Sequence, residues 1–298
     1  MPRGLRIAVW TTAGLMTGVV VITGLLFVIG GQKIDRRFAV PDEMLMLPAD
    51  SASLAEGERL SLVLGCADCH AANLAGSEMI DAPMFAVLPA TNLTRGAGGV
   101  GADYGAGGFE RAIRHGIDAA GRPLMIMPSA DYAHLSDQDV SRLVAFLLRL
   151  QPVDNHVGGR TLGPVGRIAA AIAPRGLFPA FEIDHEASHP EEVSRQVTPA
   201  FGDYLTRPCR GCHGVDLRGG RVPGAGSAAP PAGSLVPDAD GLAGWSEGDF
   251  MRALREGIRP DGTILDSAMP WRTFTLHTDD ELRAMWAFLA TGAAAGAE

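Results

Sequence analysis

The pentapeptide C-x-x-C-H occurs twice in this chain of 298 residues, as CADCH at residues 66–70 and as CRGCH at residues 209–213. This pattern is typical of covalent haem attachment, in which two thiols form thioethers with the porphyrin edge and the histidine ligates the iron. A single C-x-x-C pair is also compatible with a redox dithiol or half of a zinc site. Because both copies are complete and use all four cysteines, the sequence predicts two covalently attached haem c groups. The predicted attachment residues are Cys66, Cys69, His70, Cys209, Cys212 and His213.

A Met-Pro step follows each motif at a similar distance. Met127 follows Cys66 at nearly the same spacing as Met269 follows Cys209. Proline fixes its own φ and favours an extended residue before it, which would hold such a loop extended. We therefore predict four iron ligands, His70 with Met127 and His213 with Met269. The alternatives are ordinary core methionines and, in the first case, ligation by the neighbouring Met125.

The sequence around these motifs is duplicated. FERAIRHG at 109–116 is similar to FMRALREG at 250–257. The distance along the chain between these two blocks is almost the same as that between the two C-x-x-C-H motifs. Each copy reads as a short helix leading into the motif, a long irregular loop, a middle helix, a methionine loop and a C-terminal helix opened by a capping box. The sequence thus predicts an all-α fold with two lobes. We call residues 48–153 the first lobe and residues 193–291 the second lobe.

The segments outside the lobes differ in character. Residues 7–30 form an unbroken run without a charged side chain, long enough to cross a hydrocarbon core of about 30 Å. We predict an uncleaved N-terminal transmembrane anchor at residues 1–31, the alternative being a cleaved signal peptide. Gly14 and Gly18 form a G-x-x-x-G step that would admit a partner transmembrane helix. The predicted tether is 32–47, the connector 154–192 and the tail 292–298.

Charge indicates the kind of partner. The net charge of −9 argues against nucleic acid. Acidic side chains outnumber arginines both in residues 48–153 and in residues 194–298. We therefore predict redox partner proteins with a basic docking face. None of the six other histidines recurs at a matched position, so we expect them to face solvent or cap helices, with His185 and His189 as weaker metal candidates.

These residues resemble the class I cytochrome c family. The blocks TNLT at 91–94, MPSADY at 127–132 and WSEGDF at 245–250 are most similar to the multihaem cytochrome subunits of membrane-associated alcohol and aldehyde dehydrogenases. The resemblance implies two tandem class I cytochrome c domains with long haem-wrapping loops, on the periplasmic side of the cytoplasmic membrane. Those subunits usually have three haem domains and a different membrane attachment.

The function that this resemblance implies is a membrane-anchored dihaem cytochrome that relays single electrons. The donor would be a quinol-oxidising complex or a dehydrogenase, and the acceptor a terminal oxidase, a soluble carrier or a reaction centre. The sequence contains no recognisable substrate-converting site, and no catalytic residue is assigned. One alternative is a dihaem cytochrome c peroxidase, which needs one iron with an open position. Another is a fixed subunit of a larger membrane complex.

Overall fold

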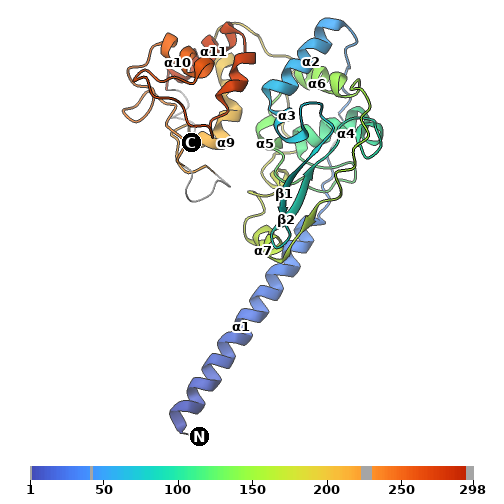
Figure 1. Cartoon of the computed structure of the whole chain (residues 1–298), viewed down its shortest axis with the longest axis vertical. Helices are drawn as coiled ribbons and strands as arrows, with labels where there is room; N and C mark the ends of the chain where they lie inside the picture. Colours follow the sequence, from blue (N-terminus) through green and yellow to red (C-terminus); the bar gives the residue numbers. More distant parts are fainter. Residues whose placement is uncertain (1, 41–42, 223–229, 293–298) are drawn as a thin grey trace.

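The computed structural model describes residues 2–40, 43–222 and 230–292. A long N-terminal helix, α1 (Arg3–Ile34), extends away from two groups of shorter helices (Figure 1). Residues 293–298 of the predicted tail, residues 41–42 of the predicted tether and part of the predicted irregular loop of the second lobe lie outside the described residues. The other elements are, in chain order, α2 (Ser51–Val63), α3 (Cys66–His70), β1 (Ser77–Ala82), β2 (Ala86–Ala90), α4 (Gly101–His115), α5 (Ser129–Tyr132), α6 (Asp137–Leu147), β3 (Thr161–Leu162), α7 (Pro164–Ile172), η1 (Pro179–Phe181), α8 (Pro199–Thr206), η2 (Arg207–Cys209), α9 (Arg210–His213), α10 (Glu247–Glu256), η3 (Trp271–Leu276) and α11 (Asp279–Leu289).

Helix α1 is long and apolar enough to cross a membrane, and nearly all of it is exposed in the isolated chain. Its C-terminal end rests on α7, where a Cβ atom at Gly30 would lie 1.8 Å from the backbone oxygen of Arg167. The Lys33 side chain donates a hydrogen bond to the backbone oxygen of Ala171 at 3.1 Å. Gly14 and Gly18 face open space. The base of α1 is therefore fixed to the first half of the chain, while its G-x-x-x-G face is free of contacts with the described residues.

The two lobes repeat the same local conformation. Leu74 and Leu217 follow their motifs with positive φ angles of 56° and 58°, which are unusual for leucine, and both side chains are buried. Pro128 and Pro270 both have φ of −78°, with ψ of 49° and 50°. Backbone angles this similar at matched positions agree with the duplication read from the sequence.

Each lobe also contains one helix crossing that requires glycine. In the first lobe α2 packs on α6, where a Cβ atom at Gly57 would lie 2.1 Å from the backbone oxygen of Arg142. In the second lobe α8 packs on α11, where a Cβ atom at Gly202 would lie 1.9 Å from the backbone oxygen of Ala284. Each of these helix pairs contributes to its lobe's own cluster of buried apolar side chains.

A three-stranded antiparallel sheet departs from the all-α prediction. Strand β2 pairs with β1, with Ser77 opposite Ala90, and with β3, with Ala86 opposite Leu162. It forms where we expected an irregular loop, and it buries alternate residues against a third apolar cluster that includes Ala170 of α7. In the corresponding part of the second lobe, the described residues contain a single isolated bridge, between residues 220 and 232.

The predicted capping boxes formed to different extents. At α11, Thr278 accepts from the backbone N–H of Glu281 at 3.1 Å, and the Glu281 carboxylate accepts in return from the N–H of Thr278 at 2.8 Å. At α6, Ser136 accepts from the N–H of Asp139 at 3.2 Å. The Asp139 carboxylate instead accepts from the Tyr204 hydroxyl of the second lobe at 2.8 Å. Only half of the predicted box at α6 is present, because its carboxylate is used between the lobes.

Candidate functional site

The histidine of each motif is held in the same tautomer by a backbone carbonyl. The Nδ1 atom of His70 lies 2.6 Å from the backbone oxygen of Thr91, and that of His213 lies 2.7 Å from the backbone oxygen of Gly233. Because a carbonyl only accepts, Nδ1 carries the proton and Nε2 keeps its lone pair. Burial lowers the pKa of both imidazoles and so favours their neutral form. A neutral imidazole oriented through Nδ1 is the arrangement that metal-ligating histidines use.

Cys66 and Cys209 pack against the apolar clusters of their lobes, whereas Cys212 is exposed. Burial raises the pKa of the Cys66 and Cys209 thiols to about 12, and it also raises those of Cys69 and Cys212. Thiols that resist ionisation are poor zinc ligands and poor redox nucleophiles. All four are free, without a disulfide. The raised pKa values thus disfavour the zinc and dithiol alternatives, and the apolar side chains beside Cys66 and Cys209 are compatible with a porphyrin edge.

The structure separates the two candidate methionines of the first lobe. Met127 packs against the same apolar cluster as Cys66, whereas Met125 belongs to the cluster beneath the sheet. In the second lobe, Met269 packs against the same cluster as Cys209. This placement supports Met127 over Met125 as the sulfur ligand.

One apolar cavity of about 360 Å³ borders both motifs. Asp68 and Cys69 reach it from the first lobe, and Cys209, Cys212, His213 and Met269 reach it from the second. Its volume is that of a ligand pocket, and most of its exposed lining is apolar although charged side chains such as Asp131 and Glu281 also border it. In the second lobe the paired thiols, the His213 imidazole and the Met269 thioether all line this cavity and together fit haem c, whereas His70 and Met127 of the first lobe do not line it.

The prediction that the remaining histidines face solvent or cap helices does not hold for His115, and His277 is the C-cap residue of η3 but does not face solvent. Their exposed fractions are 2% and 8%. His115 lies at the end of α4, beside the buried carboxylate of Glu110. The search for matched positions could not reveal it, because the residue at that position of the second lobe is Glu256.

Residues 54–151 match the cytochrome c family. The chain is 33% identical over 133 residues to the cytochrome c subunit of a quinone-dependent alcohol dehydrogenase from Gluconobacter oxydans, covering 42% of this chain and 26% of that protein. It is 27% identical over 261 residues to a dihaem cytochrome c-type protein from Cereibacter sphaeroides, covering 78% of this chain and 83% of that protein. A gluconate 2-dehydrogenase cytochrome c subunit from Pantoea cypripedii is 34% identical over 103 residues, covering 31% of this chain and 23% of that protein. The chain thus spans about a quarter of each dehydrogenase subunit.

Proposed function

We propose that this chain, which contains a domain of the cytochrome c family at residues 54–151 and has the electron-transfer function of that family, is a membrane-anchored dihaem cytochrome. The domains we propose are the anchor 1–31, the tether 32–47, cytochrome c domains at 48–153 and 193–291, the connector 154–192 and the tail 292–298. The proposal rests on one observation above all. Both C-x-x-C-H motifs present an imidazole fixed in the same tautomer, and both motifs border one cavity.

The protein's part in this function is attachment, ligand choice and orientation. Bound haem c supplies an iron centre that accepts and releases one electron at a time. The four cysteines would hold two such groups by thioethers. His70 and Met127 would ligate one iron, and His213 and Met269 the other. Because each proposed site has a sulfur ligand, both irons would be closed to substrate, which disfavours the peroxidase alternative.

The arrangement of the lobes supports an internal relay. The Arg59 side chain of the first lobe pairs with Glu281 of the second at 2.8 Å, and Tyr204 bonds to Asp139 across the same boundary. These contacts hold the two motifs on either side of a shared apolar cavity. Residues of both motifs therefore line one cavity at the boundary between the lobes.

The anchor and the relatives suggest where the relay would work. Helix α1 would hold the protein in the cytoplasmic membrane, with both lobes on the periplasmic side. Two of the similar proteins are named as cytochrome c subunits of dehydrogenases, so we propose a dehydrogenase or a quinol-oxidising complex as donor. A terminal oxidase, a soluble carrier or a reaction centre would be the acceptor. Since both lobes are acidic, partners with basic faces should associate more slowly as salt is added.

Haem stoichiometry tests the proposal. The detergent-solubilised full chain should give two haems per polypeptide in a pyridine haemochrome assay. The paired variants Cys66→Ala/Cys69→Ala and Cys209→Ala/Cys212→Ala should each retain one. A wild-type chain with one haem, or a variant pair that leaves the count at two, would contradict the dihaem assignment.

A further inference from the structure

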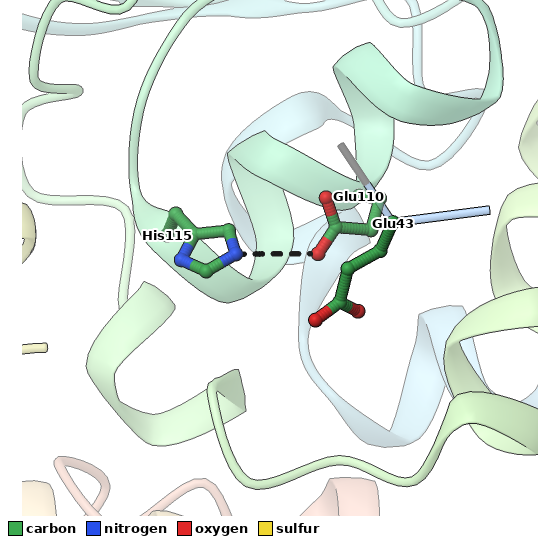
Figure 2. A group of neighbouring side chains, drawn as sticks. All are labelled: Glu43, Glu110 and His115. Carbon is green, nitrogen blue, oxygen red and sulfur yellow. Dashed lines mark ion pairs between the residues drawn. The ribbon is translucent and has the colours of Figure 1, made fainter. Parts of the chain in front are cut away.

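Three side chains that could hold a metal ion meet in the first lobe, away from both C-x-x-C-H motifs. Glu110 and His115 lie on α4, and Glu43 lies on the segment between α1 and α2. One donor atom from each lies within 4.8 Å of the other two. Figure 2 shows the His115 ring edge directed at the Glu110 carboxylate, with the Glu43 side chain beside them. We call these three residues the α4 cluster.

The facing atoms of the two buried members of the α4 cluster form no hydrogen bond with the described residues. Glu110 has an exposed fraction of 0%, and neither carboxylate oxygen has a hydrogen-bond partner among the described residues. The Nε2 atom of His115 is also buried and without a hydrogen bond there, at 3.5 Å from Oε1 of Glu110. Burying an uncompensated carboxylate is strongly unfavourable. A cation between these atoms would remove that penalty.

A chain of hydrogen bonds sets the tautomer of His115. The Nε2 atom of His185 lies 3.0 Å from the backbone oxygen of Ala180, so this nitrogen carries the proton. With His185 neutral, its Nδ1 atom is an acceptor, and the Nδ1–H of His115 donates to it at 3.1 Å. In the neutral ring with this tautomer, the Nε2 atom of His115 holds a lone pair that faces Glu110. This is how a second residue orients a metal-ligating histidine.

The charges around the α4 cluster also call for a cation. The buried guanidinium of Arg114 pairs with Asp137 at 2.6 Å and with Glu43, but Glu110 forms no hydrogen bond within the described chain. The guanidinium of Arg114 thus already pairs with two carboxylates, those of Glu43 and Asp137, and the buried Glu110 carboxylate has no hydrogen-bonded cation among the described residues. A divalent ion would balance its charge. His189, whose Nδ1 lies 3.4 Å from Oε1 of Glu43, borders the same group.

We propose that Glu43, Glu110 and His115 bind a divalent first-row transition metal ion, with Zn²⁺ as the best match. One imidazole nitrogen and two carboxylate oxygens are a donor set that Zn²⁺ accepts and that the harder Ca²⁺, which prefers oxygen alone, does not favour. The ion would tie the segment leaving the membrane helix to α4. It would therefore stabilise the attachment of the first lobe to its anchor.

The second lobe provides a natural control. When FERAIRHG is aligned with FMRALREG, Met251 stands in place of Glu110 and Glu256 in place of His115. Met251 is partly buried against the apolar cluster of its lobe. Methionine at this position is thus compatible with the fold, because the second lobe has Met251 where the first lobe has Glu110.

Metal content of the full-length haem-loaded protein, purified without a histidine tag, tests the proposal. After treatment with a chelator and dialysis against Zn²⁺, we expect one zinc per polypeptide by elemental analysis, together with a rise in Tm. Glu110→Met should lower Zn²⁺ affinity at least tenfold and abolish the rise in Tm, with haem content unchanged. Glu256→Gln, at the position of the second lobe that matches His115, should leave zinc binding as in wild type.

Further variants keep the test decisive if Glu110→Met fails to fold. Glu43→Gln, at a half-buried position, and His115→Gln should each weaken zinc binding while the haem spectrum is retained. Wild-type protein that binds no zinc would overturn the proposal, as would zinc binding that none of the three variants reduces. Because haem content is measured in the same samples, failure of this site is distinguishable from failure of the dihaem assignment.

Discussion

The first and second lobes share a scaffold but differ in what surrounds it. Both contain the C-x-x-C-H turn, the buried leucine with positive φ and the glycine-dependent helix crossing. Among the described residues, the first lobe also has strands β1 and β2, which form a sheet with β3 of the connector, and it packs beside the connector helix α7, which contacts α1 (Figure 1). It also holds the α4 cluster, which the second lobe replaces with Met251 and Glu256. The repeated parts are those that form the proposed haem sites, and the unrepeated parts connect the first lobe to the anchor.

The largest effect that we expect from changing matched residues of the two lobes is on the redox potentials of the proposed haems. Met127→His and Met269→His should each lower one of two midpoint potentials, because imidazole in place of thioether stabilises the oxidised iron. We expect shifts on the order of 0.1–0.3 V, within the ~0.8 V range that axial ligands span. Spectroelectrochemical titration measures both. Met125→Leu is the control and should leave the two potentials in place, whereas unchanged titrations in the histidine variants would mean that the ligands are misassigned.

The comparison also explains which features were readable from the sequence. The motifs, Met-Pro steps and recurring helices are local patterns, and the helices were found at the expected places. The sheet was missed because Pro89 lies within β2, where it pairs with Glu78, and proline argues against a central strand. The α4 cluster was missed because Glu43 and Glu110 are distant along the chain and lie on different elements, and sequence spacing gives no sign of such a contact.

The next effect concerns the helix crossing that both lobes contain. Gly57→Ala should destabilise the first lobe and Gly202→Ala the second, because the added Cβ would collide with a backbone oxygen that cannot move without separating the helices. We expect a loss of about 2–4 kcal/mol in each case, as for severe overpacking. Chemical denaturation followed by haem absorbance measures it. Gly248→Ala is the control, because its added Cβ would have no atom nearer than 3.8 Å. If all three variants were equally stable, the two helix crossings would not require glycine.

A smaller effect should come from the contacts between the lobes. Arg195 of the second lobe bonds to Glu56 at 2.7 Å and to Asp139 at 2.5 Å, both in the first lobe. Its side chain is 36% exposed, so solvent screening reduces the value of these pairs. We expect Arg195→Ala to cost about 1–2 kcal/mol and to let the lobes unfold at separate denaturant midpoints. Arg283→Ala, which breaks the exposed pair with Asp280, should change stability by less than about 0.5 kcal/mol.

The last effect is a pH dependence of stability, to which each lobe contributes one buried histidine at neighbouring, not identical, positions. When the two Met-Pro steps are aligned, Leu276 answers His134 and His277 answers Leu135. Burial lowers the pKa of both histidines from 6.5 to about 4. The unfolded chain therefore takes up these protons first as the pH falls, so the stabilising effect is complete above pH 6.5 and is lost progressively down to about pH 4.

His134 is the better of the two for a test, because its Nε2–H donates to the backbone oxygen of Tyr204 across the lobes at 3.0 Å. The glutamine variant His134→Gln keeps a donor and removes the titration. Between about pH 7 and pH 5, wild type should lose about 1–2 kcal/mol more stability than His134→Gln. Urea denaturation at the two pH values gives this difference. An equal loss of stability in both proteins would show that His134 is protonated as readily in the folded chain as in the unfolded one. It would then contradict a neutral His134 at the hydrogen bond to Tyr204.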